Sequence, residues 1–279
     1  MRKIEENIFK VLMILSTIII SSTLFMILYT IFSKGLGSLS WDMISKIPEG
    51  GFYIGKGGGI LNAIVGSIYI TIGSTLLGLF VSLPIVIYIN VYAKRNATLA
   101  TITRLSYDIL FGIPSIVYGA FGFAIMVYMG LKTSLLAGII TVTLMIIPIL
   151  VRAIDEVVRV VPEDMSNAVF SLGATRYESA KIILRQSIPG IITAILLSFG
   201  RAIGDAACVL FTAGFTDSIP TSLDQPAATL PLSIFFQLSS PIKEVQNRAY
   251  AAAVILTIIV LVINIVAKIA SKNLSKNKI

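Results

Sequence analysis

Histidine is absent from the 279-residue chain, and cysteine occurs once, at Cys208. A zinc-type site built from Cys and His and a disulfide within the chain are therefore both excluded. The nucleotide-binding signature Gly-x-x-x-x-Gly-Lys-[Ser/Thr] is also missing, so the chain has no such loop with which to hold ATP. We expect no cofactor and no metal, and we interpret Cys208 as a small packing residue.

Charged residues are scarce as well, at 13% of the chain against about 25% in a typical soluble domain. Hydrophobic residues make up 56%, and the mean hydropathy is +0.92. This composition predicts an all-α, polytopic membrane protein. The net charge of +8 would suit nucleic-acid binding, but the positive residues are distributed as membrane topology requires.

Long apolar runs are abundant. About 20 residues are needed to cross a bilayer as a helix, and the second of six such runs is long enough to tilt or to extend beyond the bilayer. The first follows basic residues, as in a secretory signal, but its apolar run is too long and no small-residue cleavage site follows it. We therefore expect an uncleaved helix there. The six runs are 11–32, 60–92, 105–129, 134–153, 189–215 and 249–270.

The distribution of Lys and Arg predicts the orientation of these spans. With both termini in the cytoplasm, most of the 22 Lys and Arg residues fall on the cytoplasmic side, where membrane proteins concentrate them. The chain is thus expected to be a multi-pass protein of the cell (plasma or inner) membrane. Two external loops, 33–59 and 216–248, are long. The second is rich in proline and should be irregular with short helical pieces.

Residues 152–187 form the substantial polar stretch on the predicted cytoplasmic side. Pro162 followed by two acidic residues is typical of a helix start, and Gly173 is typical of a helix stop. Residues 176–186 predict a second helix that ends at Pro189-Gly190. The apolar side chains at the glycine turn would contact either another protein or the chain's own helix ends; they are Val169, Phe170 and Leu172.

Arg201 and Asp205 are charged residues inside the fifth apolar run. A charge at the centre of a membrane helix costs about 3 kcal/mol, so such residues are kept mainly where they face a pathway or a partner. Four residues apart, they would share one helix face. We favour a role in an anion route or its gate, because the planar guanidinium matches carboxylate and phosphate geometry. A structural ion pair that locks helices together is the other interpretation.

The third apolar run contains two further candidates. Ser115 and Tyr118 follow Pro114, which would kink a membrane helix and free backbone groups near it. Their hydroxyls would either line a polar route or bond backbone carbonyls or a neighbouring helix. We expect Asp108 to pair with Arg104 one helical turn away or to face cytoplasmic water.

Several stretches resemble a known family. Residues 167–174, Asn-Ala-Val-Phe-Ser-Leu-Gly-Ala, resemble the EAA loop, Glu-Ala-Ala-x-x-x-Gly, of ABC importer permeases. Residues 200–214 are similar to the Gly-Arg-Ala-Ile-Gly-Glu…Leu-Phe-Thr-Ala-Gly stretch of phosphate-specific permeases, and residues 112–119 to their Gly-x-Pro-Ser-Ile-Val-Tyr-Gly segment. Leu-Ser-Trp-Asp at 39–42 and Thr-Leu-Pro at 229–231 match the PstA type better than the PstC type.

The resemblance runs from about residue 36 to residue 270, with named departures. Asn167 stands where the family has Glu, Val169 where it has a second Ala, and Asp205 where it has Glu. The resemblance implies the type I ABC importer permease fold (MetI-like) with six transmembrane helices. It also implies a phosphate permease subunit that is not itself an enzyme and is coupled to a separate ATPase.

By this resemblance, residues 1–59 hold the first transmembrane helix and an external loop, 60–270 the permease domain, and 271–279 a basic cytoplasmic tail. The coupling segment is 155–189. Implied partners are a PstC-type permease, a PstB-type ATPase dimer and a PstS-type external phosphate-binding protein. The implied functional residues are Arg201, Asp205, Ser115 and Tyr118 for the anion pathway, and Asn167, Ala168, Val169, Phe170, Leu172 and Gly173 for ATPase coupling.

Three alternatives stay open. The anion could be another oxyanion, such as sulfate, molybdate or phosphonate, because the charge chemistry of Arg201 does not separate them. A secondary anion transporter would predict internal repeats and more intramembrane acids for ion coupling than Asp205 alone. A membrane scaffold or receptor without transport would leave Arg201 without a role.

Overall fold

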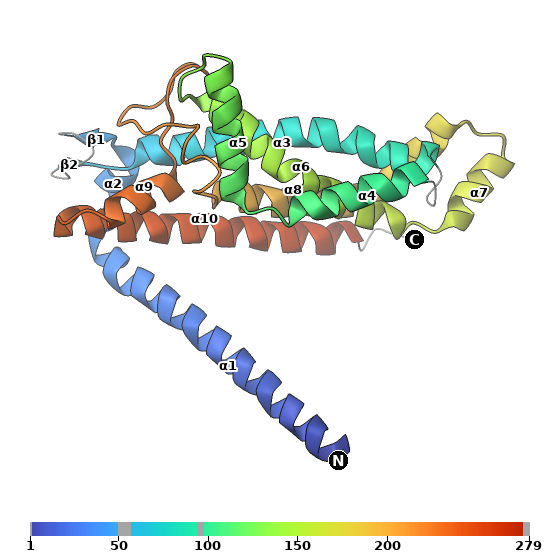
Figure 1. The fold of residues 1–279 in the computed structure, drawn as a ribbon, viewed down its shortest axis with the longest axis horizontal. Helices are drawn as coiled ribbons and strands as arrows, with labels where there is room; N and C mark the ends of the chain where they lie inside the picture. The colour runs from blue at the N-terminus through green and yellow to red at the C-terminus, as the bar shows by residue number, and fades with distance from the viewer. Residues whose placement is uncertain (1, 50–56, 94–97, 276–279) are drawn as a thin grey trace.

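The structure is a computed structural model that describes residues 2–49, 57–93 and 98–275, most of them helical (Figure 1). The elements are α1 (Arg2–Gly35), the 3₁₀-helix η1 (Leu36–Ser38), α2 (Trp41–Ser45), α3 (Leu61–Ile87), the π-helix η2 (Tyr88–Tyr92), α4 (Thr98–Phe111), α5 (Ser115–Tyr128), α6 (Leu135–Arg159), α7 (Glu163–Ser171), α8 (Arg176–Ile203), α9 (Leu230–Leu238) and α10 (Lys243–Ser275). Two short strands, β1 (Pro48–Glu49) and β2 (Gly57–Gly58), pair antiparallel.

Within the described ranges, five helical segments are long and apolar enough to cross a membrane: α1, α3 with η2, α6, α8 and α10. The pair α4 and α5 adds a sixth if it forms one bent span. The predicted all-α membrane fold is thus confirmed.

Helix α6 lies in the middle of the bundle and packs against α3, α4, α5 and α8 (Figure 1). Its residues Ile146, Leu150 and Ile154 have no exposed surface. Ile146 and Leu150 lie against Gly78 of α3, which lets the two helices pack closely. Helix α10 packs on the other side of α8 and against α9. The buried apolar side chains form two clusters: a large one centred on α6 with α3, α4, α5 and α8, and a smaller one where α10 meets α2 and the starts of α3 and α9.

Helix α1 diverges from the bundle, and its apolar window is 0% buried (Figure 1). It meets the rest of the chain at its end, where Gly35 lies directly against the backbone of Tyr250. Lys34 Nζ lies 3.4 Å from the Tyr250 hydroxyl and 4.9 Å from the centre of its ring. The long apolar sides of α1 are therefore not covered by the described part of the chain.

The fifth predicted span, 189–215, is wrong as a single helix. Helix α8 ends at Ile203, and residues 204–229, all of which are described, contain turns and no helix. The predicted break at Pro189-Gly190 is also wrong, because α8 continues through Pro189. Proline is tolerated in membrane helices where neighbouring groups compensate for the lost hydrogen bond. The helix instead begins at a capping box formed by Thr175 and Glu178.

The third predicted span is two helices, α4 and α5, bent by 98°. The break falls at Gly112-Ile113-Pro114, and Pro114 is the N-cap residue of α5. Proline disfavours the helical conformation at the residue before it and has no N–H to donate. It thus ends α4 and is already oriented to begin α5.

Candidate pathway and coupling sites

Arg201 and Asp205 come together, but on either side of a helix end. Arg201 lies in the last turn of α8, and Asp205 comes two residues after its final helical residue, Ile203. Asp205 Oδ1 accepts a hydrogen bond from the Cys208 N–H at 2.9 Å, and Oδ2 lies 3.9 Å from Arg201 Nη2. The Asp205 side chain is 6% exposed and that of Arg201 is 59% exposed. The guanidinium is therefore accessible from outside the chain, whereas the carboxylate is turned into the protein.

The turn that follows Asp205 lies against α5. A Cβ atom at Gly119 would lie 2.6 Å from the Ala207 carbonyl oxygen and 3.0 Å from that of Cys208. Only glycine permits so close an approach of two backbones. Cys208 is fully buried, as expected for a packing residue, with its Sγ 3.5 Å from the Thr141 carbonyl oxygen. The position of the Asp205 carboxylate thus depends on the position of α5.

Tyr118 and Ser115 take different places near the bend. The Tyr118 hydroxyl donates to the Leu110 carbonyl at 2.8 Å, and the side chain is buried. This bond joins α5 to the last turn of α4, where the same carbonyl also accepts the Ile113 N–H at 3.1 Å. Tyr118 therefore stabilises the bend. Of its two predicted roles, this is the bond to a backbone carbonyl. Ser115 is half-buried at the first position of α5.

Helix α7 projects beyond the ends of the long helices and packs against α8 (Figure 1). Its predicted start after Pro162 is confirmed, and Gly173 has a φ of +82°, which ends the helical segment as predicted. The side chains of Phe170 and Leu172 are 41% and 88% exposed. Of the other predicted coupling residues, Val169 is half-buried, and the exposed ones are Asn167, Ala168 and Gly173.

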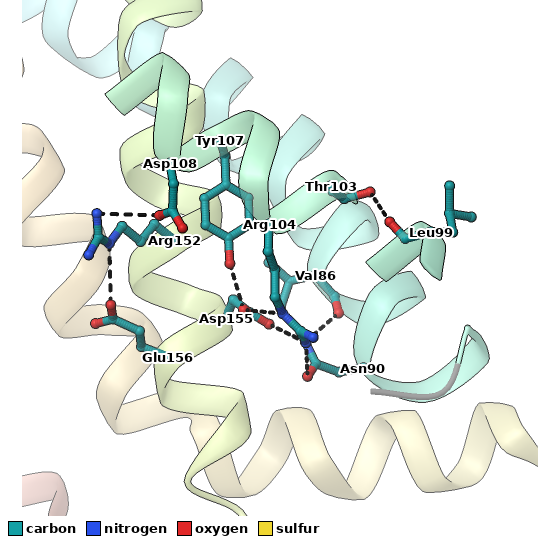
Figure 2. A network of polar contacts seen from close by, with 10 residues as sticks. All are labelled: Val86, Asn90, Leu99, Thr103, Arg104, Tyr107, Asp108, Arg152, Asp155 and Glu156. Carbon is teal, nitrogen blue, oxygen red and sulfur yellow. Dashed lines mark hydrogen bonds and ion pairs between the residues drawn. The ribbon is translucent and has the colours of Figure 1, made fainter. Parts of the chain in front are cut away.

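A buried polar cluster, not found from the sequence, joins three elements near the α7 end of the bundle (Figure 2). Asp155 of α6 is 1% exposed. It accepts hydrogen bonds from Arg104 Nε at 3.0 Å, Arg104 Nη2 at 3.3 Å, the Tyr107 hydroxyl at 2.7 Å and Asn90 Nδ2 at 2.6 Å. We call these four residues the Asp155 cluster. It connects η2, α4 and α6.

The charges in this cluster depend on one another. A buried carboxylate is stable only when it is paired and hydrogen-bonded, and removing one partner of such a pair costs about 3–5 kcal/mol. Arg104 Nη2 also lies 3.3 Å from Asn90 Oδ1, and Asn90 Nδ2 donates to the Val86 carbonyl at 3.0 Å. Both carboxylate oxygens therefore have donors, and the cluster fixes α4 against α6.

Of the two alternatives predicted for Asp108, pairing with Arg104 is wrong, whereas its side chain is 50% exposed, as the alternative of facing water requires. Asp108 Oδ1 lies 3.4 Å from Arg152 Nη1, and Arg104 is turned toward Asp155 (Figure 2). The sequence did contain a signal for the cluster: Asp155 falls on the same helical face as the buried Val151 and Val158. A carboxylate on the apolar face of a core helix requires a cationic partner from another element.

These features define a class: a multi-pass membrane protein with an interrupted helical bundle, an open arginine beside the interruption and a short helix projecting from one end. The fold is similar to a structure of the MetNI methionine ABC transporter in inward-facing conformations. The TM-score is 0.61 at 18% identity, covering 77% of this chain and 95% of that one. Residues 74–278 match the family of binding-protein-dependent transport system inner membrane components, and the chain belongs to that family.

Similar sequences carry more specific names. The chain is 33% identical over 245 residues to the phosphate transport system permease protein PstA 2 of Mycobacterium bovis, covering 86% of this chain and 79% of the relative. It is 32% identical over 258 residues to the phosphate transport system permease protein PstA of Haemophilus influenzae, covering 92% and 90%. A probable ABC transporter permease, YqgI of Bacillus subtilis, is 30% identical over 273 residues, with 92% of each chain covered.

Proposed function

We propose that this chain is the transmembrane permease subunit of an ATP-driven phosphate importer, in which it forms half of the translocation pathway. We assign phosphate as the substrate because the similar proteins are named as phosphate permeases. The observation that carries the proposal is the open guanidinium of Arg201, placed at a helix end with its neighbouring carboxylate turned inward. This arrangement offers positive charge to an anion without presenting the negative charge of Asp205.

Arg201 acts by attraction and orientation. Its planar fork donates two parallel hydrogen bonds to an oxyanion, and a bond between charged groups is about twice as strong as a neutral one. The side chain is 59% exposed on the surface of this single chain. A pathway requires a second wall, which a PstC-type permease would supply by facing the Arg201 side of α8. Ser115 and Tyr118 then support the route through the α4–α5 bend.

Helix α7 is the proposed dock for the ATPase. It is a short helix with exposed apolar side chains at its C-terminal turn, the arrangement by which a helix inserts into a groove of a partner. The α7 end of the bundle would then be cytoplasmic, with both termini on that side. A PstB-type ATPase dimer would bind there, and a PstS-type phosphate-binding protein would deliver the anion at the opposite end, near α2 and α9.

We propose the same division of the chain that the sequence suggested. Residues 1–59 anchor and lead into the bundle, 60–270 form the permease domain with its coupling segment at 155–189, and 271–279 form a basic tail. Within this division, α8 is one continuous helix between the coupling segment and Arg201. It links the dock to the anion route directly.

The test is ATP-driven uptake of labelled phosphate into proteoliposomes that contain this chain, the second permease, the ATPase and the binding protein. Arg201→Gln should lower uptake about tenfold or more, since hydrogen bonds to charged groups contribute about 1.5–3 kcal/mol. Arg201→Lys should retain part of the activity, because lysine keeps the charge and loses the planar fork. Lys268→Gln, which removes an exposed positive charge on α10 outside the coupling segment, is the control and should leave uptake unchanged.

Two results would contradict the proposal. The first is phosphate uptake by this chain without an ATPase, which would indicate a secondary transporter. The second is uptake that unlabelled sulfate or molybdate inhibits more strongly than unlabelled phosphate, which would identify another oxyanion as the substrate. Normal uptake by Arg201→Gln would separately remove Arg201 from the pathway.

A further inference from the structure

The Asp155 cluster lies close to the segment that enters the candidate dock. Asp155 comes one helical turn before the end of α6 at Arg159, and α7 begins at Glu163. On the far side of α7, Arg176 Nη1 at the start of α8 donates to the carbonyl of Tyr92 at 3.2 Å, in the last residue of η2. The chain is therefore tied to η2 both before and after α7.

The cluster also holds α4, which together with α5 forms a second connection to the anion site. We call these two helices the α4–α5 arm. Arg104 and Tyr107 belong to α4, which continues to the 98° bend into α5. The bond from Tyr118 to Leu110 closes this bend. Gly119, the next residue of α5, lies against the turn that positions Asp205. Contacts between packed groups thus lead from the end of α6, which continues into α7, through the cluster, α4 and α5 to the Asp205 turn.

We infer that the Asp155 cluster is a coupling element that makes α4 and α5 move as one body with the α7 end of the chain. This inference rests on the proposed function. Helix α8 carries the motion of α7 to Arg201, and the α4–α5 arm carries the same motion to the turn that contains Asp205. Without the cluster, α8 would move, but the turn that contains Asp205 would not move with it. Arg104, Tyr107, Asn90 and Asp155 are positioning residues in this scheme, since none of them contacts the anion.

The local chemistry suits a coupling role better than simple stabilisation. A buried ion pair is often no more stabilising than apolar residues of similar volume, but it fixes one arrangement because each charge must find its partner. One member of the cluster, Asn90, lies on a π-helix, an element frequently found at functional sites. Replacing the pair by apolar residues should therefore preserve the fold and relax the connection.

The first experiment measures phosphate taken up per ATP hydrolysed by the complete complex in proteoliposomes. The variant Arg104→Met with Asp155→Leu removes both charges together, so no buried charge is left unpaired. We expect it to assemble and to hydrolyse ATP within about twofold of wild type, with uptake per ATP lowered about tenfold. Tyr107→Phe removes one hydrogen bond and no charge, and should lower the same ratio about threefold. Arg152→Gln breaks exposed ion pairs on the same helices and should leave it unchanged.

A second measurement does not depend on phosphate. Spin labels on Val160→Cys, in the α6–α7 connection, and Phe121→Cys, in α5, report the distance between the dock and the arm. Both positions are exposed, and the native Cys208 is buried. In the wild-type complex this distance should stay constant when ATP binds. In the Arg104→Met, Asp155→Leu variant it should change or broaden.

The outcomes separate the two proposals. If the wild-type complex takes up no phosphate, the proposed function fails, and the spin-label distances still test the coupling element. A normal uptake ratio in the double variant would overturn the coupling element, and so would a wild-type distance that changes with ATP. If ATP hydrolysis falls in parallel with uptake, the cluster supports the dock rather than the connection, and the inference is also wrong. If the double variant fails to assemble, Tyr107→Phe and the wild-type distances decide the question.

Discussion

At the scale of single residues, Asp205 has a structural role that does not depend on its charge. Its Oδ1 accepts the Cys208 N–H at 2.9 Å, three residues on, as an N-cap side chain does, whereas its contact with Arg201 is longer, at 3.9 Å. The strong bond holds the turn, and the weaker contact orients the guanidinium. If Arg201 lines an anion route as proposed, this arrangement keeps the Asp205 carboxylate from repelling the anion.

Substitution of Asp205 separates these two tasks. Asp205→Asn keeps the Oδ1 acceptor and removes the charge, so phosphate uptake should stay within about threefold of wild type. Asp205→Ala removes the acceptor, at a cost of about 1 kcal/mol for a capping side chain, and releases the turn. We expect at least about tenfold lower uptake. The measurements are phosphate uptake by both variants and the thermal midpoint of each complex. If both variants lost uptake equally, the charge of Asp205, and not its hydrogen bond, would be the property that uptake requires.

The residue types of the site could be predicted, but several partners could not. Arg201 and Asp205 stand out in the sequence because charges are rare in apolar runs, and their role in an anion route stays a prediction. The helix end between them was missed, because it depends on a side chain that bonds the backbone and on the approach of α5 at Gly119. The partner of Asp108 was predicted from sequence spacing, whereas the actual partner, Arg152, comes from another helix.

At the scale of elements, the direction of α7 depends on one backbone conformation. Gly173 has a φ of +82°, and a Cβ atom there would meet no other atom within 4 Å. Alanine would thus fit sterically but would disfavour this left-handed conformation by about 1–2 kcal/mol. The turn would shift, and with it the exposed side chains of Phe170 and Leu172. The position therefore allows the orientation of α7 to be changed without touching its surface.

Gly173→Ala should weaken binding of the ATPase subunit about tenfold, since 1–2 kcal/mol of strain opposes the docked orientation. The measurement is titration of the purified ATPase against the permease pair in nanodiscs. Gly130→Ala is the matched control. Gly130 also has a positive φ, +69°, with open space around it, but it follows α5 and lies outside the α7 segment. Similar losses in both variants would mean that general destabilisation, and not the dock, is responsible.

The helical elements were largely predictable because apolar length decides membrane spans. Helix α7 was also predictable, since Pro162 and Gly173 mark its ends locally. The continuity of α8 through Pro189 was not, because it depends on packing: a Cβ atom at the adjacent Gly190 would lie 2.3 Å from the Val157 side chain of α6. Local sequence signals a break there, and contact with the core helix overrides it.

At the scale of the whole molecule, the chain leaves large apolar surfaces uncovered. The apolar window of α1 is 0% buried within the structure, whereas that of α6 is 67% buried. In a bilayer, lipid can cover an apolar helix, so exposure alone does not require a partner. Because α1 diverges from its own bundle and meets α10 only toward its C-terminal end, we predict that its apolar sides contact a neighbouring subunit.

A chain without residues 1–34 should therefore keep its bundle and lose its partner. Because α1 buries none of its apolar window on the bundle, the helices from α3 to α10 should retain their packing. Association with the second permease should weaken about tenfold or more, equivalent to about 1.4 kcal/mol. A matched control replaces residues 11–32 by a leucine–alanine helix of equal length, which preserves membrane insertion and the Lys34–Gly35 contact. Co-purification of the tagged second permease measures the association. If the control helix restores it fully, α1 acts only as an anchor; if the truncated chain still binds, α1 is not part of the interface.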